Sequence, residues 1–231
     1  MSKAYYNAKL SGKRTRKPLV CVLWGIDKMQ QRLSYNLAVY IANNINRHSA
    51  KEGLEFTKMI FGVESFLITI SKLIVVYTLA ILLGTMVQTL IIQISFSLLR
   101  RHSFGLHALK STICTVVSCC LFVLVPWLLS GAGVGNIVVI ALYIPMMFCF
   151  YIYAPADTKA RPLVGKELRA QLKNRTLMCV VALMVATLLI PSQSVKLLLT
   201  IGAVYQCISI LPLTYKILRR SEKNYEQYED V

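Results

Sequence analysis

Two residues in the middle of the chain could act together as a nucleophile and a base. His107 and Cys114 stand seven positions apart within residues 100–114, RRHSFGLHALKSTIC. A cysteine thiolate is a strong nucleophile, and a neighbouring imidazole can take up the thiol proton, so this pair is typical of thiol peptidases. On one straight helix the pair would be about 10 Å apart along the axis, too far for a hydrogen bond. We therefore expect His107 to precede the helix that carries Cys114, with Gly105 and a helix start at Ser111 letting the chain fold back.

The start of a helix would also favour the thiolate form of Cys114. Ser111 as N-cap places Cys114 at the third helical position, where free backbone N–H groups stabilise an anion. Lys110 and Arg101 add positive potential. Taken singly, a histidine before a membrane span is usually an interfacial residue, and a cysteine within a span usually packs as a small apolar side chain.

A metal site is not expected, because Cys119 and Cys120 lie more than a turn deeper than Cys114. No cofactor is expected either. Aspartyl, zinc-dependent and GxSxG serine hydrolases and P-loop ATPases are not expected, because their motifs are missing. No acidic residue occurs between Glu64 and Asp157, so paired intramembrane carboxylates are absent. HExxH, GxSxG and the Walker A pattern are absent as well.

The composition predicts that these residues are positioned by membrane-spanning helices. Of 231 residues, 56% are hydrophobic and 16% are charged, and the mean hydropathy is +0.57. The net charge of +16 would suit a nucleic-acid partner, but the basic residues sit between long apolar runs and no nucleic-acid-binding motif occurs. Anionic membrane lipid is therefore the expected partner of this charge, and no nucleic acid is expected. Seven cysteines without a CxxC pair make a disulfide framework improbable.

The predicted fold is all-α: a polytopic membrane helical protein with about six transmembrane segments and an N-terminal interfacial amphipathic helix. The predicted spans are two within residues 60–99, separated by a turn near Gly84 and Thr85, then 113–129, 137–153, 177–190 and 197–218. Residues 154–176 are expected to form a polar loop. The predicted regions are a flexible basic tail (1–18), a cytoplasmic amphipathic helical region (19–58), a transmembrane domain (59–218) and a cytoplasmic C-terminal tail (219–231).

The amphipathic region is predicted from apolar residues at three- and four-residue steps, with polar residues between them. These are Ile26, Met29, Leu33, Leu37, Tyr40, Ile41 and Ile45.

The distribution of Lys and Arg predicts the orientation. Residues up to Lys58 hold eleven, the 100–112 segment three, the 154–176 segment six and the C-terminal end four. The turns near residues 84 and 133 hold no Lys or Arg, and the turn near residue 193 holds one, Lys196. The positive-inside rule then places both termini and the His107–Cys114 segment on the cytoplasmic side. If residues 60–99 contain one span and a re-entrant piece, the number of spans is lower.

Three stretches together resemble the AgrB family. Residues 100–114 resemble its motif of a basic pair, G-x-H-A and a cysteine seven residues after the histidine. Residues 153–162, YAPADTKARP, are similar to a second family loop, and the surroundings of Lys72, Tyr77 and Thr78 are similar to its first span. The resemblance covers roughly residues 25–215, and both the basic N-terminal tail and the acidic end 225–231 lie outside it.

The resemblance implies a quorum-sensing membrane endopeptidase whose substrate is an AgrD-like propeptide with an amphipathic leader and an acidic C-terminal tail. It implies that Cys114 is the nucleophile and His107 the base, that the product is a cyclic thiolactone or lactone peptide, and that the protein self-associates, as a possible homodimer. Asp157 could orient His107 across two cytoplasmic loops.

The basic residues near the site have two interpretations. They can set the topology and contact lipid phosphates, or they can dock the acidic propeptide tail. The candidates for substrate contact are Arg100, Arg101, Lys110, Asp157, Lys159 and Arg161. Two other functions compete with a peptidase: a small peptide transporter or exporter, and a non-catalytic membrane adaptor.

Overall fold

The computed structural model describes residues 18–49, 52–106, 111–158, 163–218 and 224–226. Its helices, in chain order, are α2 (Pro18–Ser49), α3 (Gly53–Leu82), α4 (Met86–Ser103), α5 (Ser111–Cys119), a π-helical turn (Cys120–Leu124), α6 (Val125–Leu128), α7 (Asn136–Tyr153), α8 (Lys166–Leu189), α9 (Gln193–Ile210) and α10 (Pro212–Ile217). The chain divides into two compact units, residues 1–71 with 110–112, and residues 72–109 with 113–231.

In the first unit, α2 has a buried face of small residues and an exposed face with large apolar residues. Its small residues Ser34, Ala38 and Ala42 recur at four-residue steps and are buried, as expected for one face of a helix. Several large apolar residues of the predicted stripe are exposed, among them Leu33 and Tyr40 at 60% and 68%, whereas Ile41 is half-buried. An outward apolar stripe suits a helix that lies against lipid. The helix ends at Ser49 rather than near residue 58, and α3 already begins at Gly53.

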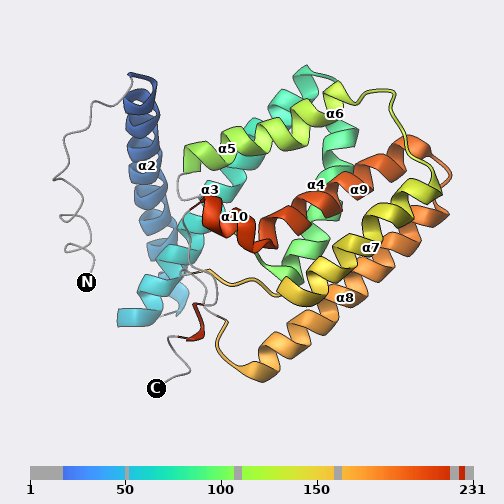
Figure 1. The fold of residues 1–231 in the computed structure, drawn as a ribbon. Helices are drawn as coiled ribbons and strands as arrows, with labels where there is room; N and C mark the ends of the chain where they lie inside the picture. The colour runs from blue at the N-terminus through green and yellow to red at the C-terminus, as the bar shows by residue number, and fades with distance from the viewer. Residues whose placement is uncertain (1–17, 50–51, 107–110, 159–162, 219–223, 227–231) are drawn as a thin grey trace. The chain divides into compact units, whose positions relative to one another are not determined.

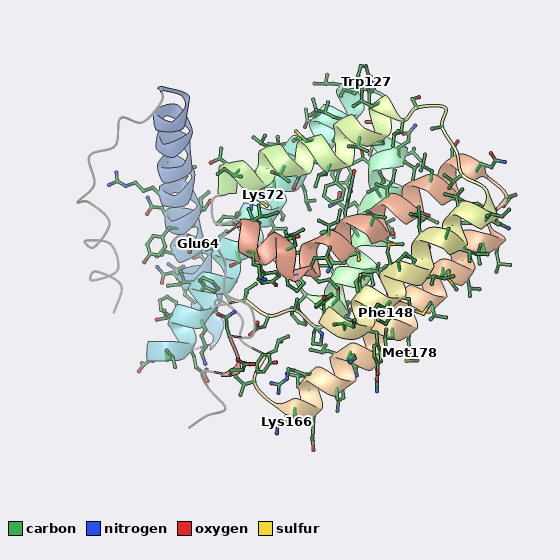
Figure 2. All side chains as sticks on the ribbon, in the orientation of Figure 1. Glu64, Lys72, Trp127, Phe148, Lys166 and Met178 are labelled. Carbon is green, nitrogen blue, oxygen red and sulfur yellow. The ribbon has the colours of Figure 1, made fainter. Side chains whose placement is uncertain are left out.

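In the second unit, four helices meet around one apolar core. The core contains Tyr143 and Phe150 of α7, Val180 of α8, Ile210 of α9 and Leu99 of α4. Helices α4 and α9 run side by side, as do α7 and α8 (Figure 1). Figure 2 shows large apolar side chains on the outer surface of this unit, among them Trp127, Phe148 and Met178, which are 49%, 65% and 71% exposed. Lipid is the natural solvent for such a surface.

Four helices of the described residues are long and apolar enough to cross a membrane: α3, α7, α8 and α9. The segment Thr112–Leu128 is apolar but shorter, and α4 is not in the group. The chain is therefore an all-helical, multi-pass membrane protein, as predicted. Each of the six predicted spans corresponds to helical structure, and the predicted turn separates α3 from α4 at Gly84, whose φ is 68°. The number of crossings stays a prediction.

Two predicted boundaries were wrong. Residues 154–176 are not a loop throughout, because α8 begins at Lys166 (labelled in Figure 2) and its first turns carry several of the basic residues. The last predicted span is divided at Leu211, which is extended (φ −66°, ψ 135°) ahead of Pro212. Proline disfavours helical backbone at the residue before it, so α9 ends and the short α10 starts anew.

Pro126 explains the π-helical turn and its tertiary contacts. Without an N–H, it cannot donate to the carbonyls four and five positions earlier, those of Phe122 and Leu121. Side chains from two other helices donate instead: Thr89 Oγ1 to the Phe122 carbonyl at 2.8 Å, and the Tyr205 hydroxyl to the Leu121 carbonyl at 3.0 Å. The helix that carries Cys114 is thereby tied to α4 and α9.

Gly202 lets the backbones of α4 and α9 approach closely. A Cβ at this position would lie 2.6 Å from the Ile92 carbonyl oxygen and 2.7 Å from Ser95 Cβ. Ser95 Oγ in turn donates to the Leu199 carbonyl at 2.7 Å. Small residues with hydrogen-bonding side chains are the usual means of packing helices in membranes.

Gly202→Val is expected to destabilise the protein by about 3 kcal/mol through overpacking. That loss corresponds to a fall in apparent Tm of about 6–12 °C for a chain of this size. Fluorescence-detected size-exclusion after graded heating in detergent measures it. Gly62→Val is the matched control, because nothing lies within 4 Å of a Cβ there. Equal losses in the two variants would contradict the close α4–α9 packing.

Candidate active site

The end of α4 forms a tight, hydrogen-bonded loop. Phe104 has a φ of 55° and Gly105 a φ of 113°, so the helical backbone of α4 ends at this point. The Gly105 N–H donates to the Ala156 carbonyl at 3.0 Å, and the Ala156 N–H donates to the Ser103 carbonyl at 3.0 Å. Residues 103–105 and the loop after α7, which are far apart in sequence, are therefore paired directly.

Gly105 is required by both its conformation and its surroundings. A Cβ at this position would lie 2.7 Å from Ser209 Oγ and 3.2 Å from the Ser209 carbonyl oxygen. The next residue, Leu106, donates its N–H to that carbonyl at 3.2 Å. The backbone is thus held on α9 up to the residue before His107.

Gln206 of α9 also binds this loop through its side chain. Its side chain is fully buried, and its Nε2 donates to Ser103 Oγ at 2.7 Å and to the Phe104 carbonyl at 2.6 Å. Its Oε1 accepts from Ser209 Oγ at 3.0 Å. A buried amide with donors and acceptor satisfied fixes the loop more strongly than apolar contacts would. Gln206 was not among the predicted site residues, although a glutamine inside the last apolar run is a signal of a buried polar contact.

Arg100 links this loop to the cysteine. It lies in the last turn of α4, beyond the apolar run, and its Nη2 donates to the Leu106 carbonyl at 2.8 Å. Its guanidinium also stacks 5.2 Å from the Phe96 ring centroid. Burial lowers the pKa of Arg100, while ionised Cys114 and Tyr215 nearby act in the opposite direction. Arg100 is thus a half-buried cation close to Cys114 and to the backbone at Leu106.

Cys114 lies in the first turn of α5 and is a half-buried free thiol. Ser111 is itself the first described residue of α5, and the residues before it lie outside the described part of the chain, so the predicted N-cap at Ser111 stays a prediction. The expected partner of Cys114, His107, lies outside the described residues, as do Lys110, Lys159 and Arg161. The structure therefore describes the chain on both sides of His107, at Leu106 and from Ser111 onward.

Of the other predicted contact residues, Arg101, next to Arg100, is exposed and Asp157 is buried. Asp157 is only 4% exposed, and its carboxylate accepts from the Tyr225 N–H at 2.9 Å and from Asn224 Nδ2 at 3.4 Å. Its backbone carbonyl accepts from the Tyr215 hydroxyl at 3.0 Å. The Asp157 carboxylate is thus engaged by the C-terminal segment.

Comparison with known proteins gives a consistent family match. The model of the family Accessory gene regulator B (AgrB) matches residues 34–210. An AgrB-like protein of Clostridium acetobutylicum is 39% identical over 193 residues, which are 84% of this chain and 92% of that protein. An AgrB-like protein of Listeria monocytogenes is 40% identical over 75% of this chain and 85% of its own length.

A more distant relative carries the family description as its name. The accessory gene regulator protein B of Staphylococcus epidermidis is 28% identical over 75% of this chain and 89% of that protein. No solved structure matches.

Proposed function

The chain belongs to the AgrB family, and from this membership in the accessory gene regulator quorum-sensing system we propose that it is a membrane cysteine endopeptidase. Its substrate is an AgrD-like propeptide, from which it removes the C-terminal tail. Cys114 is the nucleophile and His107 the general base. The product is a cyclic thiolactone or lactone signalling peptide.

One observation carries the assignment of the site. The Arg100 guanidinium donates to the Leu106 carbonyl at 2.8 Å, and a negative charge at Cys114 would raise the pKa of Arg100. Leu106 immediately precedes His107 in the sequence, so Arg100 holds the chain directly before the proposed base. Arg100 is therefore a positioning residue in this proposal rather than a substrate contact.

In the first step, the Cys114 sulfur attacks the carbonyl carbon at the junction between signal and tail. His107 takes the thiol proton and delivers it to the leaving amine as the peptide C–N bond breaks. The tail departs with a free amino terminus, and the signal portion stays bound as a thioester. Free N–H groups in the first turn of α5 are candidate donors to the oxyanion.

In the second step, a thiol or hydroxyl within the signal portion attacks the thioester carbonyl. The bond to Cys114 breaks, the proton of the attacking group returns to the enzyme, and a ring closes. Exchange between thioesters is nearly neutral in free energy, whereas forming a thioester from an amide is uphill, so removal of the tail must draw the first step forward. A site at the lipid boundary keeps water from the thioester.

The proposed orientation has both termini and the active site on the cytoplasmic side. It is supported by the positive residues at the ends of the predicted spans. The exposed basic residues Arg101 and Lys166 are placed to meet anionic lipid or the acidic part of the propeptide.

The test is to trap the acyl-enzyme in lipid vesicles. A propeptide whose ring-closing residue is replaced by alanine cannot cyclise, so the thioester should accumulate on the wild-type protein. Intact mass spectrometry should show an adduct of the signal portion, and digestion should locate it at Cys114. Neutral hydroxylamine should release it, because hydroxylamine cleaves thioesters.

Two outcomes would contradict the proposal. The adduct could map to another residue, such as the exposed Cys120 of the same helical segment. Alternatively, the adduct could resist hydroxylamine, which would show that it is not a thioester.

A further inference from the structure

A pocket of about 270 Å³ lies beside the loop that follows α7. Its apolar wall includes Pro155, Ile210 and Pro212, and its polar wall includes Asp157, Arg169 and Lys173. Two of these polar residues are cations from the first turns of α8. The pocket is thus an apolar hollow with a positively charged rim, which suits a peptide that carries both an aromatic ring and acidic groups.

The chain's own C-terminal segment already fits this description. Tyr225 lines the pocket, and the Arg169 guanidinium lies 3.9 Å from the centroid of its ring. The neighbouring Asn224 is only 3% exposed. Both residues donate hydrogen bonds to the Asp157 carboxylate, the Tyr225 N–H at 2.9 Å and Asn224 Nδ2 at 3.4 Å.

The sequence around Tyr225 is acidic. Residues 221–231 read SEKNYEQYEDV and contain four acidic residues and one lysine. The residue that covers the polar wall of the pocket is therefore an aromatic residue within an acidic peptide, set against Arg169. Opposite charge on the two sides would add to the ring contact, most strongly at low salt.

The pocket is directly connected to the candidate active site. Ala156, in its wall, pairs with Gly105, which stands two residues before His107 in the sequence. Tyr215, also in the wall, donates to the Asp157 carbonyl and lies close enough to Arg100 to influence its pKa. The pocket therefore adjoins the loop that leads in sequence to His107.

We propose that this pocket, together with the adjoining surface of Asp157 and Arg169, is a binding site for an acidic peptide segment with an aromatic side chain, and that residues 224–226 cover part of this site as a built-in competitor of the peptide substrate. The competitor role rests on the proposed function, whereas the peptide site does not. A substrate segment must displace Tyr225 from Arg169 before it can bind. The C-terminal segment thereby lowers the apparent affinity for substrate according to the fraction of time that it covers the Asp157 and Arg169 surface.

A binding assay without turnover tests the peptide site. The full chain with Cys114→Ala is placed in lipid nanodiscs, and a fluorescein-labelled synthetic peptide, SEKNYEQYEDV, is titrated by anisotropy. Adding Asn224→Ala and Tyr225→Ala should tighten peptide binding about tenfold, since a segment that covers this surface about nine-tenths of the time imposes that factor. Arg169→Gln and Lys173→Gln should each weaken binding to the uncovered site.

Matched variants separate the ring from a general loss of structure. Tyr225→Phe keeps the ring over Arg169 and should bind the peptide as weakly as the parent. Tyr228→Ala removes another tyrosine of the same acidic segment and should leave the Kd unchanged. Equal Kd values for the parent and the double variant would overturn the occupancy by residues 224–226. If neither Arg169→Gln nor Lys173→Gln changes the Kd of the peptide, the proposed site is wrong.

A second arm distinguishes this inference from the proposed function. With Cys114 intact, Asn224→Ala with Tyr225→Ala should lower the propeptide KM several-fold. If Cys114 cleaves the propeptide but KM does not change, the competitor role is wrong and the peptidase stands. If no cleavage occurs while the labelled peptide behaves as expected, the peptidase is wrong and the peptide site stands.

Discussion

Cys114→Ala is expected to reduce propeptide cleavage by at least about 10³-fold, because no other group can form the acyl intermediate. His107→Ala should reduce it by about 10²–10⁴-fold, the usual contribution of a positioned base. The double variant should be no worse than Cys114→Ala, since nucleophile and base act as one unit. Purified protein in vesicles with the propeptide, followed by mass spectrometry, measures all three.

The same segment supplies matched controls for both substitutions. Cys120→Ala removes an exposed free thiol from the same helical segment. His102→Ala removes the other histidine near the site, which is half-buried in the last turn of α4. Both controls should retain cleavage within about threefold of wild type, the range expected of substitutions away from the reacting groups. Normal cleavage by Cys114→Ala would contradict the cysteine mechanism and favour the transporter or adaptor hypothesis.

Gln206→Leu is expected to reduce kcat by about 100-fold while the helices remain folded, because a misplacement of about 1 Å at a reacting group can cost this much. The substitution keeps the volume of the side chain but removes two donors and one acceptor. Ser103 Oγ and the Phe104 carbonyl then lose their partner at the turn that leads to His107. Each buried group left unpaired costs about 1–3 kcal/mol, so the loop should shift to find water or another partner.

Steady-state kinetics distinguish loop positioning from substrate binding. A positioning role predicts a fall in kcat with KM within about threefold, because an interaction made in the transition state is lost. Gln193→Leu is the control on the same helix, since Gln193 is exposed at its start. An unchanged kcat in Gln206→Leu would show that the loop is held without this amide. A higher KM with an unchanged kcat would assign Gln206 to substrate binding instead.

Much of the architecture followed from local sequence. Runs of apolar residues longer than a soluble core needs predicted an all-helical membrane protein, and they do so because backbone groups in lipid must be satisfied within a helix. Gly84 predicted the turn between α3 and α4 correctly. The boundary error at residues 154–176 arose because polar sequence was interpreted as a loop. Lys166, Arg169 and Lys173 are compatible with helix, and charge indicates where a helix leaves the membrane rather than where it ends.

The placement of Cys114 was also predictable, whereas its surroundings were not. A serine followed by an apolar run predicts a helix start, and Cys114 lies in the first turn of α5. Spacing alone could not show that Arg100 binds the Leu106 carbonyl or that Ala156 pairs with Gly105. These contacts join segments from different helices, so they depend on how α4, α7 and α9 pack.

By itself, the sequence determined the chemistry that is possible here: a cysteine, a histidine, a membrane fold and membership in the AgrB family. Residue types and short-range periodicity carry that information, because they set nucleophilicity and hydropathy locally. Only the tertiary structure decided that Gln206 supports the loop before His107 and that Asp157 holds the C-terminal segment. Hydrogen bonds between distant residues are chosen by packing, since a buried polar group pairs with whichever partner the folded helices bring to it.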